Sequence, residues 1–163
     1  MPWRIRQAGH ADLEAAARAK AQSWVESFDE LLPEDVLLRQ LDPVRISRTV
    51  GLWTDVLDGG GYLWVVVGDD GEIVGVAHAG FGRDADAPTP LELYVMCLRA
   101  QAQGSGVADA LLRTAIGDSP AYLWVLSGNH RAHAFYRRNG FAPDGTTTLI
   151  EPLGVAKERW VRE

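Results

Sequence analysis

The segment "QAQGSG", Gln101–Gly106, lies between an apolar strand pattern at 91–98 and an apolar helix pattern at 107–117. Two glycines at the start of a helix reduce stability, so they need another reason to be there. A helix start presents unpaired N–H groups and the positive end of the helix dipole, both of which attract phosphate. Glycine removes the Cβ that would hold a phosphate away, and it permits the φ > 0 at which successive N–H groups converge. The segment is therefore interpreted as a phosphate-binding loop built from main-chain groups.

Two familiar phosphate loops do not fit this segment. A Walker loop ends in Gly-Lys-Ser/Thr, and the segment contains no lysine. The dinucleotide-binding fingerprint needs a third glycine at the position of Asp109, whose carboxylate would face the pyrophosphate. A glycine-rich turn without a ligand remains the alternative interpretation of these six residues taken alone.

The segments around this loop alternate between strand and helix patterns. Apolar–polar alternation, apolar runs and the turn signal "DDG" predict strands at 3–8, 62–68, 72–81, 91–98 and 121–127, with one or two more within 146–163. Apolar spacing of three and four residues predicts helices from Asp12 onward, at 33–41, 44–57 and 107–117, and at 130–139 between an Asn129 cap and Gly140. The nearly all-apolar "AYLWVLS" predicts a central strand, and "GRDADAPTP" at 82–90 predicts a loop. This order predicts an α/β sandwich with a mixed sheet.

The composition indicates one globular domain spanning residues 1–163, with 47% hydrophobic and 23% charged residues. The net charge of −6 argues against nucleic-acid binding, which needs clustered Lys and Arg. The first twenty residues carry charges throughout, so we expect neither a signal peptide nor a membrane anchor. The single Cys97 has no partner for an internal disulfide. A cytoplasmic location is the expectation.

Two motifs relate the sequence to a known family. Gln101–Gly106 matches Gln/Arg-x-x-Gly-x-Gly/Ala and resembles the acyl-CoA pyrophosphate loop of the GNAT superfamily of N-acyltransferases. In that family a later strand leads into Asn-x-x-Ala-x-x-Phe-Tyr-x-x-x-Gly-Phe. This chain carries the second motif at Asn129, Ala132, Phe135, Tyr136, Gly140 and Phe141. The resemblance covers about residues 3–163, and its specific motifs lie within 91–141.

The resemblance implies both a fold and an acyl donor. The fold is a mixed, mostly antiparallel sheet of six to seven strands, splayed between the fourth and fifth strands, with helices on both faces. The donor is acetyl-CoA, whose pantetheine arm pairs with the fourth strand in the splayed gap. The implied cofactor-binding residues are Tyr94, Val95 and Met96 through their backbone, Gln101, Ala102, Gln103, Gly104, Ser105 and Gly106 at the pyrophosphate, and Asn129 near the pantetheine. One backbone N–H of 94–96 would polarise the thioester carbonyl.

The resemblance also assigns the catalytic groups. Tyr136 would donate to the departing thiolate, as a phenol with a pKa of about 10 is protonated at neutral pH. The thiol pKa of about 8.5 makes full proton transfer mildly uphill, so a stabilising hydrogen bond describes the role better. An amine with a pKa of about 10.4 must lose a proton before it attacks. Glu92 is the candidate base: many family members carry their glutamate where this chain has Pro90, and Glu92 points to the same strand face. A solvated charge at Glu92 and a base at His78 are the alternatives.

Other reactive side chains are given structural roles. His130 and His133 begin a helix that we expect to be exposed, so both are predicted to be solvated. Cys97 has no histidine in a sequence relation that would activate it, and a buried structural thiol is the prediction. No His, Cys, Asp or Glu cluster has metal-ligand spacing, so no metal is predicted.

The acceptor is expected to bind near the first helices, where the family places specificity. "SWVESFDELLPED" contains Trp24, Phe28 and Asp29, together with Glu26 and Glu30. This aromatic and acidic mixture could hold a cation, although the apolar stripe of the helix also favours core packing for at least one ring. The prediction is therefore an N-acetyltransferase acting on a small amine by direct attack in a ternary complex. The alternatives are a protein N-terminal or lysine acetyltransferase and a non-catalytic acyl-CoA sensor, and a homodimer is left open.

Overall fold

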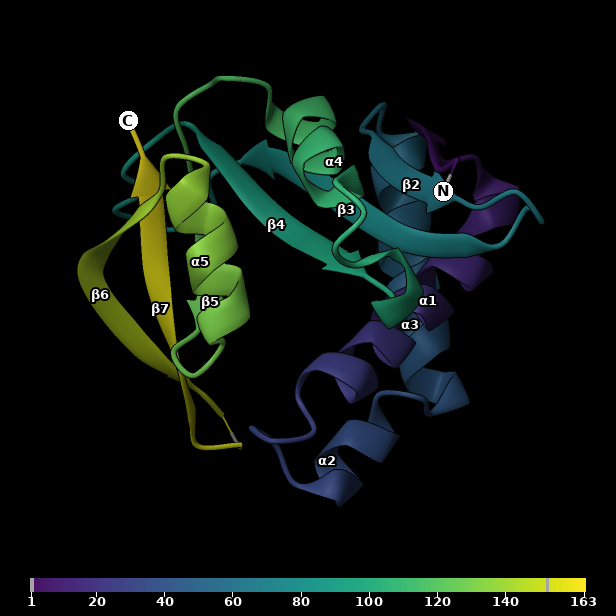
Figure 1. Cartoon of the computed structure of the whole chain (residues 1–163), viewed down its shortest axis with the longest axis horizontal. Helices are drawn as coiled ribbons and strands as arrows, with labels where there is room; N and C mark the ends of the chain where they lie inside the picture. The colour runs from purple at the N-terminus through teal and green to yellow at the C-terminus, as the bar shows by residue number, and fades with distance from the viewer. Residues whose placement is uncertain (1, 152) are drawn as a thin grey trace. The chain divides into compact units, whose positions relative to one another are not determined.

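The structure is a computed structural model that describes residues 2–151 and 153–163. Its described strands form one mixed sheet of seven, in the order β1-β2-β3-β4-β5-β7-β6. The strands are β1 (Arg4–Gln7), β2 (Leu63–Val67), β3 (Ile73–Phe81), β4 (Leu91–Leu98), β5 (Ala121–Leu126), β6 (Ala142–Ile150) and β7 (Val155–Arg162). The helices are α1 (Leu13–Ser27), α2 (Glu34–Arg39), α3 (Pro43–Asp58), α4 (Val107–Ile116) and α5 (His130–Arg138), with short 3-10 turns η1 (His10–Asp12) and η2 (Ala100–Ala102). Figure 1 labels the helices and strands along the chain.

Strand pairing confirms the predicted sheet. The pairs β1–β2, β2–β3, β5–β7 and β6–β7 are antiparallel, whereas β4 and β5 are parallel. The β4–β5 register joins Glu92 to Tyr122 and Leu93 to Leu123, near the start of each strand, and no other pair joins these two strands among the described residues. The pairing therefore ends early, as the expected splay requires.

The described residues group into two compact units, and the chain passes between them more than once. The first unit runs as far as His78 and then takes Val95–Ala115, while the second takes Ala79–Tyr94 and Ile116–Glu163. β3 and β4 each contribute residues to both units. Each unit is described by itself below.

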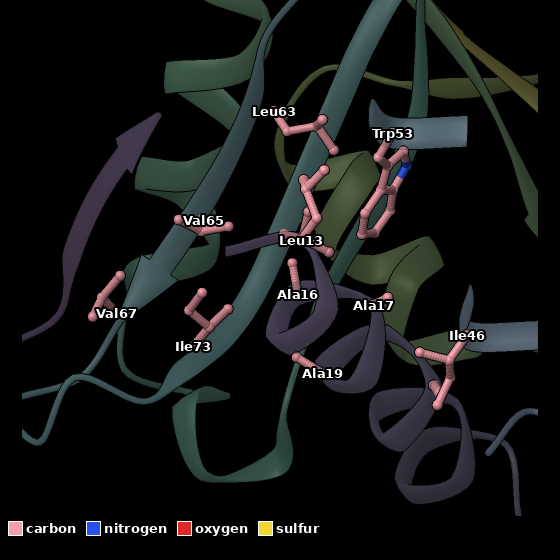
Figure 2. Close-up of a cluster of buried hydrophobic side chains, with 12 residues drawn as sticks. Leu13, Ala16, Ala17, Ala19, Ile46, Trp53, Leu63, Val65, Val67 and Ile73 are labelled. Atoms are coloured by element: carbon pink, nitrogen blue, oxygen red, sulfur yellow. The ribbon is translucent and has the colours of Figure 1, made fainter. Parts of the chain in front are cut away.

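The first unit has helices on both faces of its strands. On one face α1 and α3 lie side by side over side chains of β2 and β3, which are Leu63, Val65, Val67, Ile73 and Val76 (Figures 1 and 2). The buried side chains of that layer include Leu13, Ala17, Ile46, Trp53, Leu63 and Val65. On the other face Val66, Val74 and Ala77 pack against Val107 and Leu111 of α4. Because neighbouring strand residues point to opposite faces, β2 supplies both layers and is apolar throughout.

The second unit is built on β5, β6 and β7 with α5 packed against them. β5 is almost fully buried and lies between β4 and β7, which confirms the central strand predicted from its apolar run. Trp160 of β7 is 1% exposed and stacks on His133 of α5, with ring centroids 4.9 Å apart. Asn129 caps α5 by accepting a hydrogen bond from the N–H of Ala132, and Gly140 follows the helix with φ of 90°, both as predicted.

None of the described helices combines the length and apolar character that crossing a membrane requires.

Candidate active site

The segment Gln101–Gly106 of the first unit is an open loop that leads into α4. Gly104 and Gly106 have φ of 76° and 84°, in the left-handed region that other residues avoid. A Cβ added at either glycine would meet no atom within 4 Å, so conformation rather than crowding explains both residues. The N–H groups of Gly104, Ser105 and Gly106 donate no hydrogen bond to any described residue, and all three residues are exposed. These N–H groups are available to an anion at the helix N-terminus.

The flanks of this loop are fixed although its tip is open. Gln103 donates from its amide to the carbonyl of Leu98 at 3.1 Å, and Ser105 donates from its hydroxyl to the carbonyl of Ala102 at 2.6 Å. Ala102 is fully buried, whereas Gln101 is exposed. The loop therefore holds its N–H groups in place before any ligand binds, which lowers the entropic cost of binding.

The segment 94–96 of β4 places its side chains in packing contacts. Val95 packs against the layer of α1 and α3, and Met96 against the layer of α4. In the second unit the ring of Tyr94 lies under the Arg83 guanidinium, 4.1 Å from its centroid, and its hydroxyl donates to the carbonyl of Phe81. The side chains of 94–96 are half-buried in these contacts, and the prediction uses only the backbone of this segment.

Glu92 is a buried carboxylate in the second unit, only 1% exposed. Its Oε1 accepts from the N–H of Arg83 at 2.9 Å, from Arg83 Nε at 3.3 Å and from the Tyr122 hydroxyl at 2.8 Å. Its Oε2 accepts from Arg83 Nη2 at 2.7 Å. Burial opposes ionisation of Glu92, but the hydrogen bonds and charge of Arg83, with the Tyr122 hydroxyl, hold its pKa below the usual range. The alternative of a solvated charge is wrong, because the carboxylate is a buried, ion-paired anion whose Oε2 is covered by Arg83.

Sequence analysis missed the network around Glu92 because its members are far apart in the chain. Arg159 of β7, 5% exposed, donates to Asp84 and Asp86 of the 82–90 loop and to Asp144 of β6. Asp84 also accepts from Trp124 Nε1 at 3.0 Å, and its N–H donates to the Tyr122 hydroxyl. Arg159 itself was a usable signal, because an arginine that is buried within a strand needs carboxylate partners.

The α5 residues of the second unit divide into a capping group and packed rings. Asn129 uses its Oδ1 for the helix cap, which leaves its amide NH₂ as the donor. Tyr136 is 8% exposed, and its ring contacts Phe141 with centroids 5.6 Å apart. The expectation for His133 was wrong: its ring stacks on Trp160 and bonds to the Leu126 carbonyl, so only 12% of the side chain is exposed. His130 is exposed as predicted.

The residues proposed for the acceptor lie in the last turn of α1 and just beyond it. Trp24 and Phe28 pack edge to face with centroids 4.9 Å apart, both half-buried, and Asp29 is exposed. Glu26 accepts from Arg99 Nε at 2.7 Å, so its charge ties α1 to the end of β4. The Glu26 carboxylate is therefore engaged by Arg99, whereas Asp29 is exposed.

Cys97 and His78 are the other candidate reactive groups of the first unit. Burial raises the pKa of the Cys97 thiol, although a hydrogen bond with Ser23 and the charge of Lys20 act against this rise. An un-ionised, half-buried thiol matches the predicted structural role. His78 is half-buried on β3. In the part of the chain that the structure describes, no three His, Cys, Asp or Glu residues are arranged to hold a metal ion.

A family model for the acetyltransferase (GNAT) domain matches residues 59–143, which is more than half of the chain. The chain belongs to the GNAT acetyltransferase family. The matched segment contains both the Gln101–Gly106 loop and the Asn129–Phe141 motif, and it runs from before β2 to the start of β6. No curated protein matches the sequence.

Solved structures share the GNAT fold at low sequence identity. The PaiA N-acetyltransferase from Thermoplasma acidophilum, solved with coenzyme A, has a TM-score of 0.73 at 17% identity, over 97% of this chain and 98% of that chain. An N-acetyltransferase from Staphylococcus aureus has a TM-score of 0.72 at 17% identity, over 100% and 99%. A GNAT phosphinothricin acetyltransferase from Sinorhizobium meliloti, solved with AcCoA, has a TM-score of 0.68 at 18% identity, over 99% and 88%. These likenesses confirm the predicted fold class.

Proposed function

We propose that this protein is an acetyl-CoA-dependent N-acetyltransferase that acetylates the primary amine of a small molecule. The observation that carries the proposal is the open Gln101–Gly106 loop, with two left-handed glycines and unpaired N–H groups at the start of α4. Family membership supports the reaction type, and two structural neighbours were solved with coenzyme A or AcCoA. The pyrophosphate would accept hydrogen bonds from Gly104, Ser105 and Gly106, and the pantetheine would pair with the backbone of 94–96.

The reaction would proceed by direct attack. The amine nitrogen attacks the thioester carbonyl carbon, the C–S bond breaks, and coenzyme A leaves as a thiolate. A backbone N–H of 94–96 would stabilise the oxyanion, a contribution of roughly 3–4 kcal/mol for one such donor. In the second unit, Tyr136 would donate a hydrogen bond from its hydroxyl to the thiolate, and Asn129 would contact the pantetheine through its amide NH₂.

The proton on the amine is the harder requirement. Glu92 is our proposed base, and its pKa below the usual range keeps it ionised at neutral pH. Arg83 Nη2 covers Oε2, but the Arg83 side chain is 62% exposed and so has room to move away. We therefore propose that the amine reaches Glu92 when Arg83 releases Oε2.

Two measurements on the wild-type protein test this proposal. Acetyl-CoA at a hundred times its Kd should raise the free energy of unfolding by about 2.7 kcal/mol, measured as a thermal shift. A panel of small amines, with peptides as a second panel, should then release coenzyme A, detected as free thiol. Absence of any thermal shift at saturating acetyl-CoA would contradict the proposal. A shift without thiol release across both panels would instead identify an acyl-CoA sensor, and release with peptides alone would identify a protein acetyltransferase.

A further inference from the structure

A hollow of about 180 Å³ lies in the first unit, between α1, the end of α2 and α3. Ala17 and Ile46 belong to the buried layer labelled in Figure 2, so they form its apolar floor. Its other lining residues include three cations, which are Lys20, Arg45 and Arg48. The volume corresponds to roughly six water molecules at about 30 Å³ each, so a small organic molecule or its end group would fit.

Within residues 2–151 and 153–163, the three cations of the hollow are not paired with a carboxylate. Neither Lys20, Arg45 nor Arg48 makes an ion pair with any described carboxylate. Nearby arginines on the same helices behave differently, because Arg18 pairs with Glu14 and Arg39 with Asp35, each one helical turn away. Among the cations of α1, α2 and α3, those without an ion pair therefore all line the hollow.

Arg45 and Arg48 are exposed and Lys20 is half-buried, and two features of their placement favour a bound anion. Arg45 lies in the first turn of α3, where the helix dipole disfavours positive charge. Burial lowers the pKa of Lys20, and the charge of Arg45 lowers it further, although Cys97 acts in the opposite direction. An anion bound among the three side chains would offset both the repulsion and the dipole.

The rim indicates that the ligand also has an apolar part. Trp24 is half-buried beside the hollow, and Leu52 is 63% exposed at its edge. Thr49 and Gln40 use their hydroxyl and amide hydrogens on the carbonyls of Arg45 and Val36, so the charged groups are the main donors to a ligand. The sequence suggested that Trp24 could help to hold a bound cation, whereas in the structure this ring shares the lining of the hollow with Lys20, Arg45 and Arg48.

We propose that this hollow binds the carboxylate or phosphate group of a small, partly apolar molecule. Its lining residues include none of those assigned to acetyl-CoA, so the site does not depend on the proposed function. The anionic group could belong to the amine acceptor or to a separate small ligand, and both share the same chemistry.

Anion titrations test the site directly. Inorganic phosphate, butyrate and benzoate are titrated into the wild-type protein by thermal shift and by amide NMR, with NaCl at matched ionic strength as the reference. We expect saturable binding of at least one anion, with the largest amide shifts around Lys20 and Arg45–Thr49. The Arg45→Gln/Arg48→Gln variant should bind at least tenfold more weakly, while Arg39→Gln, which also removes an exposed arginine, should bind as the wild type does.

Two outcomes would overturn the site. One is the absence of saturable binding for every anion, and the other is equal binding by the double variant and Arg39→Gln. The wild-type protein alone tests the site if the double variant does not fold. Amide shifts centred away from Lys20 and Arg45–Thr49 would contradict anion binding in the hollow.

Kinetics then separate the two sources of the anion. The KM is compared for an amino acid and for the amine that lacks its carboxylate. If the anion belongs to the acceptor, the double variant should raise the KM for the amino acid alone. Unchanged KM values with weakened anion binding assign a separate ligand. Failure of the proposed function would appear as no coenzyme A release by the wild-type protein, with anion binding intact.

Discussion

At the scale of single residues, Glu92 has two proposed roles, as a partner in an ion pair and as a catalytic base. Substitutions at Glu92 and at Arg83 can distinguish these roles. Its carboxylate accepts four hydrogen bonds from described residues, three of them from Arg83. The same carboxylate is proposed to take a proton from the amine. An ion pair contributes to the stability of the fold, whereas a base contributes to the rate.

Glu92→Gln should therefore change both stability and rate. The amide keeps the shape but leaves Arg83 without a counter-charge, so the Tm should fall. Loss of the base should lower kcat/KM by at least a hundredfold at pH 7. Arg83→Gln is the matched control, because it removes the same ion pair and keeps the carboxylate, so it should share the fall in Tm and retain most of the rate. A Glu92→Gln variant with a lower Tm and full kcat/KM would reduce Glu92 to an ion-pair role.

Tyr136→Phe tests the other catalytic residue. Phenylalanine preserves the ring that packs on Phe141, so the fold should remain and the affinity for acetyl-CoA should change little. Loss of the hydroxyl should lower kcat about tenfold to a hundredfold, since the departing thiolate loses its donor. Tyr62→Phe, at a 59% exposed tyrosine, is the control for loss of a phenol. Equal kcat for Tyr136→Phe and the wild type would return this ring to a packing role.

Residue roles were predictable where their cause is local in sequence. The Asn129 cap needs only the next three residues, and the sequence identified it. The environment of Glu92 was not predictable, because Tyr122 is thirty positions away and a tertiary fold brings it near. His133 was predicted as solvated because helix periodicity does not show which face packs on Trp160.

At the scale of elements, the loop before α4 depends on backbone conformation. Gly104→Val introduces a β-branched residue at φ of 76°, where the left-handed conformation costs about 1–2 kcal/mol, and its methyl groups stand beside the proposed phosphate. We expect the acetyl-CoA thermal shift to disappear while the protein stays folded. Gly117→Val is the matched control, because Gly117 also has positive φ and open space at its Cβ. It should lose similar stability and keep the shift, and an equal loss of binding in both variants would remove the loop from the site.

At the same scale, the types of the elements were predicted well because hydrophobic periodicity is local in sequence. The order of the strands in the sheet was not predicted. The hairpin of β2 and β3, the strand β4 and the helix α4 follow their patterns closely. The position of β7 between β5 and β6 depends on pairing across the fold, which no local pattern encodes. β6 begins at Ala142, earlier than the predicted tail strands. The prediction missed its start because Pro143 and Gly145 weaken a strand pattern.

At the scale of the whole molecule, stability in acid should depend on the carboxylates held by arginine. Hydrogen bonds from Arg159 lower the pKa of Asp86. Burial opposes ionisation of Asp144, but the Thr146 N–H and Arg159 hold its pKa below the usual range. Glu92 is lowered as well. Each lowered pKa contributes stability above the ordinary carboxyl pKa of about 4, and this stability is lost as the pH falls through the folded-state value.

Arg159→Met should weaken the dependence of the free energy of unfolding on pH in acid. At pH 7 the variant leaves Asp84, Asp86 and Asp144 without the counter-ion that Arg159 supplies, so the free energy of unfolding should fall. Without Arg159 the pKa of Asp86 and of Asp144 is no longer lowered by this guanidinium, so their protonation costs less stability and the difference from the wild type should narrow between pH 5 and pH 3.5. Denaturant titrations at pH 7, 5 and 3.5 measure it, with Arg39→Met, an exposed i,i+4 pair, as a control expected to change little. A deficit that is the same at every pH would show that Arg159 acts through packing rather than charge.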